Sequence, residues 1–131
     1  MATGTVVISE AMSDVSAHIV KVVFAWSEDQ GAAGDTTTNL FNGTALNLIT
    51  EPSAVDVPAD LYDVEVLDDD GYDIFVGAGL NRSNTAIEQT AGFVAGGVPR
   101  NLKNTHLTLS VTNASGAKPP SAGIAIVYIA E

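Results

Sequence analysis

The sequence predicts an all-β fold: a single antiparallel β-sandwich, jelly-roll-like, with about eight strands. Apolar and polar residues alternate with a period of two in several stretches, and clusters of Gly, Asn, Asp and Pro separate these stretches. No long stretch has the 3.6-residue period of an amphipathic helix. The chain has 131 residues, 46% of them hydrophobic, which is enough to bury one core. We therefore expect residues 1–131 to form one domain.

The first half of the chain contains three strand candidates. Residues 1–9, "MATGTVVIS", form either an extended N-terminal arm or an edge strand. Residues 16–27 alternate, so that one face of the strand carries His18, Val20, Val22, Phe24 and Trp26 and the other carries Lys21 and Val23. Residues 28–39 are polar and glycine-rich, which predicts a long loop. Residues 43–50 form the next strand, and the two prolines that follow end it.

The second half contains the clearest alternation. Residues 61–67, "LYDVEVL", alternate apolar and acidic side chains, which is typical of a strand with one buried and one hydrated face. After the turn "DDDG", residues 72–77 are expected to form the second strand of a hairpin. Residues 83–93 are the only segment with the pattern of a helical turn. Residues 106–114 alternate cleanly, and residues 122–130 are mostly apolar, as expected of a closing strand in a core position.

The charge of the chain excludes two classes of partner. Sixteen acidic residues against five basic ones give a formal net charge of -11, and no basic residue occurs between Lys21 and Arg82. Such a surface repels phosphate backbones and anionic lipids, so we expect neither nucleic acid nor membrane as a partner. The absence of cysteine excludes disulfides and thiolate metal sites. The N-terminal residues do not have the pattern of a signal peptide, so we expect synthesis in a cytoplasm.

The acidic turn at residues 68–71 has two interpretations. Asp-Gly between two alternating runs favours a hydrated hairpin turn, because glycine adopts positive φ without a Cβ clash. The alternative is a calcium loop with Asp68 and Asp70 as ligands. Aligned on an EF-hand loop, however, Val66 takes the first ligand position and Gly77 the last, so the ligand set is incomplete. The hairpin turn is the stronger prediction.

No motif in the chain carries a reaction. No serine lies in a nucleophile elbow, and the glycine-rich stretches do not match a phosphate-binding loop. His18 and His106 are the only histidines; we expect His18 in or near the core and His106 at the rim of a strand. Trp26, with Phe24, forms either part of the core or a platform for a sugar ring. We expect no catalytic residues, no cofactor and no enzymatic activity.

Two stretches resemble small virion structural proteins of tailed bacteriophages. The first is "DLYDVEVLDDDGYDIFVGAGLNRSN", with its acidic hairpin and Gly-Ala-Gly-x-Asn turn, and the second is "LTLSVTNASGAKPPSAGIAIVYI". The earlier stretch "IVKVVFAWSED" is similar to an aromatic strand of the same proteins. The resemblance covers residues 19–129, and the chain departs from it at "KPPSAG", where relatives tend to carry a glycine-rich turn. These motifs form turns and strands, so they indicate a fold family more than an activity.

The resemblance implies a capsid decoration, or cement, protein with a sandwich or jelly-roll fold that binds the outer capsid surface of the virion and stabilises the shell. Its partners would be the major capsid protein and further copies of itself, as a homodimer or homotrimer. We select as interface candidates the residues of the N-terminal segment and the large apolar residues in or beside loops. These are Thr5, Val6, Val7, Ile8, Phe41, Phe93 and Val94.

Two other functions stay open at this point. One is a tail-associated or receptor-binding module that holds carbohydrate through Trp26, Tyr62 or Tyr72. The other is a small enzyme that uses the carboxylates of residues 68–73 for acid–base chemistry, which would require one of them to be buried.

Overall fold

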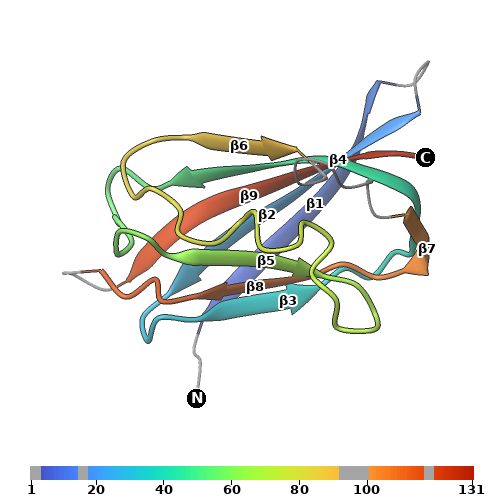
Figure 1. Cartoon of the computed structure of the whole chain (residues 1–131). Helices are drawn as coiled ribbons and strands as arrows, with labels where there is room; N and C mark the ends of the chain where they lie inside the picture. The colour runs from blue at the N-terminus through green and yellow to red at the C-terminus, as the bar shows by residue number, and fades with distance from the viewer. Residues whose placement is uncertain (1–3, 15–17, 92–100, 117–119) are drawn as a thin grey trace.

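The computed structural model of the chain describes residues 4–14, 18–91, 101–116 and 120–131. Over these residues it contains nine strands, arranged as two antiparallel sheets that face each other, and no helix (Figure 1). The strands are β1 (Thr5–Asp14), β2 (Ile19–Glu28), β3 (Ala33–Thr36), β4 (Phe41–Pro52), β5 (Asp63–Leu67), β6 (Glu88–Ala91), β7 (Asn101–Thr105), β8 (Thr108–Thr112) and β9 (Ser121–Ala130). The predicted all-β sandwich is confirmed.

The order of the strands is that of a jelly roll. In an eight-stranded jelly roll, one sheet contains the first, eighth, third and sixth strands, and the other contains the second, seventh, fourth and fifth. Counted from β2, the larger sheet has the order β2-β9-β4-β6, with β7 also paired to β4, and the smaller sheet has the order β3-β8-β5. The remaining place beside β5 is taken by an irregular segment, which is held by the bridges Leu67↔Asp73 and Tyr62↔Arg82. β1 is an additional strand at the edge of the larger sheet.

The core lies between the sheets, and β2 shows how the sequence places it there. Val20, Val22, Phe24 and Trp26 are buried, while the residues between them are half-buried or exposed, so this part of the predicted alternation is confirmed. The opposite wall of the core comes from the smaller sheet. Its fully buried side chains include Val64 and Val66 of β5 and Leu109 and Val111 of β8.

Two segments differ from the expected pattern in the middle of the chain. The predicted loop at residues 28–39 contains β3, a short strand whose pairing with β8 supplies the order that its polar, glycine-rich composition does not. The expected strand at residues 72–77 is instead a pair of turns. The carboxylate of Asp73 accepts hydrogen bonds from the backbone N–H groups of Phe75 and Gly77 at 3.0 and 2.8 Å, which bends the chain away from a strand.

Three further expectations are corrected or decided. The expected helical turn at residues 83–93 is replaced, within the described residues, by β6, which pairs with β4. His18 does not lie on the buried face of β2; it is exposed in the turn before that strand, at a positive φ of 54°. The described part of residues 1–9 is an edge strand rather than an extended arm, because β1 pairs with β2 along its length.

Candidate functional site

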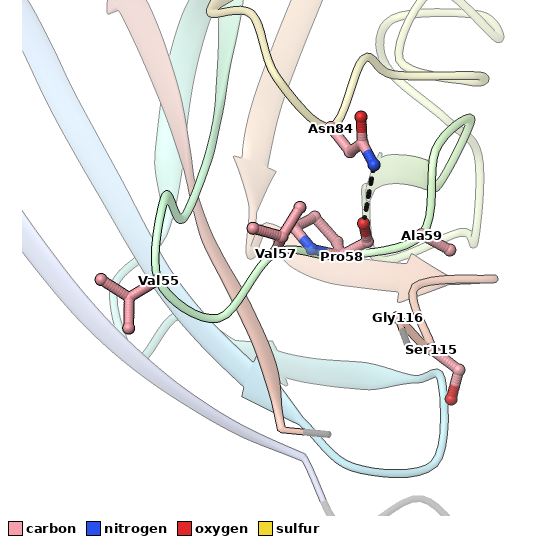
Figure 2. A pocket seen from close by; sticks show the side chains of 7 residues that line it. All are labelled: Val55, Val57, Pro58, Ala59, Asn84, Ser115 and Gly116. Atoms are coloured by element: carbon pink, nitrogen blue, oxygen red, sulfur yellow. Dashed lines mark hydrogen bonds between the residues drawn. The ribbon is translucent and has the colours of Figure 1, made fainter. Parts of the chain in front are cut away.

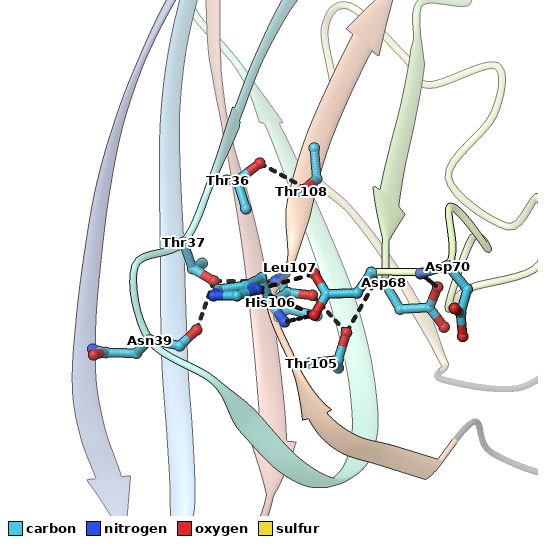
Figure 3. A network of polar contacts seen from close by, with 10 residues as sticks. Thr36, Thr37, Asn39, Asp68, Asp70, Thr105, His106, Leu107 and Thr108 are labelled. Atoms are coloured by element: carbon cyan, nitrogen blue, oxygen red, sulfur yellow. Dashed lines mark hydrogen bonds and ion pairs between the residues drawn. The ribbon is translucent and has the colours of Figure 1, made fainter.

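The acidic turn between β5 and the irregular segment is built by its own carboxylates. The Asp68 carboxylate oxygen Oδ1 accepts a hydrogen bond from the backbone N–H of Asp70 at 3.0 Å (Figure 3). It accepts a second one from the backbone N–H of Tyr72, also at 3.0 Å. Two backbone hydrogen bonds close the same turn, and Gly71 supplies a positive φ of 80°. The sequence therefore placed this turn correctly, although the hairpin strand expected after it does not form.

The next aspartate ties this turn to the loop between β7 and β8. The backbone N–H of Asp69 donates to the Thr105 hydroxyl at 2.9 Å, and its carboxylate lies 3.0 Å from Nδ1 of His106. The backbone N–H of His106 donates to the same carboxylate at 3.2 Å. Both side chains of the pair are well exposed, so solvent screens their charge interaction and its contribution to folding is small. His106 thus lies at the end of the sandwich, as expected, where it holds two loops together.

These contacts leave little of the turn for a metal or for catalysis. Among the described residues, no group of three or more acidic or histidine side chains is placed to hold a metal ion. Oδ1 of Asp68 is directed at backbone N–H groups, and Asp70 is exposed in the turn. Neither arrangement buries a carboxylate without a hydrogen-bond partner. A carboxyl group needs such burial to act as a general acid.

Replacing Asp68 by alanine is expected to lower the free energy of unfolding by about 1–2 kcal/mol, because two backbone N–H groups lose a charged acceptor. Asp70→Ala is the matched control, and its exposed side chain should change stability by less than about 0.5 kcal/mol. Urea denaturation with and without calcium measures both variants. Stabilisation by calcium that disappears in either variant would restore the calcium alternative.

A hollow of about 350 Å³ lies between the loop after β4, the segment before β6 and the loop after β8. Val57, Pro58, Ala59, Asn84 and Ser115 line it, together with Val55 and Gly116 (Figure 2). The Asn84 amide donates to the backbone carbonyl of Pro58 at 3.2 Å, so this polar group serves to join two loops. None of the lining side chains is titratable, so the hollow offers no general acid or base.

Two of the three aromatic side chains proposed for carbohydrate binding lie in the core rather than at the surface. Trp26 and Tyr62 are 2% and 0% exposed, and their rings pack 5.6 Å apart inside the core. Burial raises the pKa of the Tyr62 phenol to about 12, although the neighbouring Thr50 hydroxyl partly offsets the shift. Neither ring can stack on a sugar from this position. Tyr72, which is exposed in the acidic turn, is the one of the three that a ligand could reach.

The feature that calls for a partner is the outer face of the larger sheet, here named the open face. Because side chains alternate along a strand, the residues between the buried ones of β2 and β9 point away from the core. The apolar members of the open face include Val7 of β1, Ile19, Val23 and Ala25 of β2, Ala122, Ile124, Ile126 and Tyr128 of β9, and Ile49 of β4.

Strand pairing places these side chains in contiguous rows. Val23, Ile126 and Ile49 lie opposite one another on β2, β9 and β4, and form the middle row. Ile126 is 8% exposed, yet it is not a member of the core cluster. Its side chain lies on the outer side of the sheet, where the neighbouring side chains of the open face cover most of it. At the edge strand the face is uncovered: Val7 is 70% exposed. An aliphatic surface of this extent marks a site of protein–protein contact.

The open face is also almost free of charge. Along β1, β2, β9 and β4, the charged side chains described on the open face are Lys21 and Glu51, so their charges sum to zero on a chain whose net charge is -11. Small side chains at one end of the face leave a shallow hollow of about 370 Å³, lined by Ala25, Glu51, Ala122 and Ile124 among others.

The interface candidates from the sequence divide between the faces of the sheet. Thr5 and Val7 point outward on the open face, whereas Val6 and Ile8 pack against the core from the edge strand. Phe41 is 4% exposed, so its selection was wrong: it begins β4 and its side chain belongs to the core rather than to a loop. Phe93 and Val94 lie outside the described residues. The β2 and β9 members of the open face were not selected.

The chain matches no model of a protein family, and no curated protein and no solved structure is significantly similar to it. Among the residues that the structure describes, no helix is long and apolar enough to cross a membrane.

Proposed function

We propose that the protein is a non-enzymatic structural protein of a tailed-phage virion, which binds the outside of the capsid and stabilises the shell. The observation that carries this proposal is the open face, because a contiguous aliphatic sheet surface marks a site of protein–protein contact, which a protein that assembles on a particle requires. The acidic remainder of the chain suits the outside of a particle better than contact with packaged DNA.

The mechanism is thermodynamic rather than chemical. A protein that binds the assembled shell, and not its dissociated subunits, stabilises the assembled state by mass action. Many copies bound at repeated positions add avidity, so each contact can be modest. No residue needs to react in such a mechanism, and the carboxylates of Asp68, Asp69 and Asp73 accept hydrogen bonds that hold the turns.

The two longer stretches that carry the resemblance to phage virion proteins contribute two strands to the smaller sheet and one to the larger sheet. The first comprises β5, the acidic turn and the irregular segment beside β5, and the second comprises β8 and much of β9. The alternating half of β9 supplies the open face. Strand β9 therefore carries part of the resemblance and also part of the proposed contact surface.

Shell binding is tested by mixing purified protein with empty, expanded shells of its phage, followed by sedimentation and cryo-electron microscopy. We expect density at regular positions on the outer surface and a higher melting temperature of the shells. Ile124→Lys should weaken binding at least about tenfold, because it places a charge in the apolar face and so disrupts the protein–protein contact on which assembly and avidity depend.

Ser110→Lys is the matched control, since it adds the same charge on the outer side of β8 in the smaller sheet and should bind like the unmodified protein. Bare shells, with the protein left in the supernatant, would contradict the proposal. A tail or receptor role through Tyr72 would then be measured with a glycan panel.

A further inference from the structure

We infer that the open face is covered by a second copy of this chain, in a two-fold dimer that pairs Lys21 of each copy with Glu51 of the other. This inference rests on the proposed function in one respect, since both require that the open face is covered by protein. It adds the identity of that protein and the orientation of the two sheets, and it leaves the shell to be bound by the dimer through surfaces outside the open face.

The first argument is the distribution of charge. Two copies of a chain with a net charge of -11 repel each other over most of their surface. On the part of the open face formed by β1, β2, β9 and β4 the local repulsion is smallest, because the described charges there, Lys21 and Glu51, cancel. This face is therefore the place where a second copy can approach at the lowest electrostatic cost.

The second argument is the position of the two charges. Lys21 lies opposite Tyr128, two residues beyond Ile126 on β9, and Glu51 lies opposite Ile124, two residues before it. Since β2 and β4 flank β9 on opposite sides, the two charges occupy opposite corners around Ile126. With the ordinary spacings of a sheet, each corner is about 8 Å from Ile126.

These positions suit a two-fold axis. The axis lies in the plane of the interface, passes over Ile126 and runs perpendicular to the line that joins the two charges. Rotation by 180° about this axis exchanges the two corners. Each Lys21 then faces Glu51 of the other copy, and the contact occurs twice because the interface is isologous. The strands of the two sheets cross at about 70°, near the orthogonal class of sheet packing.

Within this arrangement the apolar centre and the charges have separate roles. The middle row, Val23, Ile126 and Ile49, meets its own symmetry copy and supplies the buried apolar area. The charge pairs lie toward the rim, where they select the orientation and contribute less to affinity.

The test uses three variants of the full chain in sedimentation velocity across a concentration series: Lys21→Glu, Glu51→Lys, and the double exchange. The unmodified protein should be a dimer. Each single variant places two like-charged pairs in the interface and should raise the dimer dissociation constant about tenfold or more. The double exchange restores both pairs with reversed polarity, so its dissociation constant should return close to that of the unmodified protein. Circular dichroism and thermal unfolding confirm that each variant is folded.

A monomer or a trimer at every concentration would overturn the inference, and so would single variants that dimerise as well as the unmodified protein. Failure of the double exchange to recover dimerisation would overturn the proposed pairing in the same way. Since the measurement contains no shells, its outcome is separate from that of the proposed function. A dimer that does not bind shells contradicts the capsid role alone, whereas a monomer that binds them contradicts this inference alone.

Discussion

Replacing Gly43 by alanine is expected to destabilise the protein by about 3 kcal/mol or more, enough to leave a marginally stable domain partly unfolded. Gly43 lies in β4, where the pairing with β7 shifts register, and its φ is +107°. A side chain is strained at that angle, and a Cβ at this position would overlap the backbone carbonyl oxygen of Ala130 on the neighbouring strand. The clash is with backbone, so a rotamer change cannot relieve it.

Gly71→Ala separates the two causes. Gly71 also has a positive φ, of +80°, but a Cβ there would meet no atom within 4 Å. We expect this variant to lose only about 1 kcal/mol, which is the conformational cost alone. Guanidinium denaturation of both variants gives the comparison. Equal losses would mean that β4 and β9 do not approach at Gly43 as described.

The parts of the fold that follow from the sequence are those in which local pattern and tertiary environment agree. The alternation in β2 predicts its buried face because a strand packed on one side buries every second residue. The turn at Asp68 is predictable for the same reason: its hydrogen bonds are local, between residues at most four apart. By contrast, β3 is a strand because it pairs with β8, which is far away in the sequence. Its own composition is typical of a loop.

The open face could not be predicted because aliphatic residues on a strand indicate burial without saying what buries them. Residues 122–130 are apolar on both faces, which indicates a strand covered on two sides. The structure places β9 in the middle of the larger sheet, between β2 and β4, and among the described residues no strand covers its outer face. Phe41 shows the converse error, since a large residue next to a predicted loop belongs to the core when the strand begins two residues earlier than expected.

Val23 and Phe24 are adjacent on β2 and should respond to substitution in opposite ways. Phe24 is fully buried between the sheets, and Phe24→Ala is expected to cost about 3–5 kcal/mol of unfolding free energy, through lost apolar burial and the cavity that remains. Val23 points to the open face, where it is half-buried by its neighbours. Val23→Thr keeps the branched shape and the preference for a strand, so it should cost less than about 1 kcal/mol.

The comparison is made by chemical denaturation at a protein concentration low enough to keep any dimer dissociated, so that folding alone is measured. In that regime Val23 is in contact with water in both the folded and the unfolded chain, while Phe24 leaves water only on folding. A loss of several kcal/mol in Val23→Thr would mean that this side of β2 is covered within a single copy. In that case the open face, and the assembly built on it, would not exist in the folded monomer.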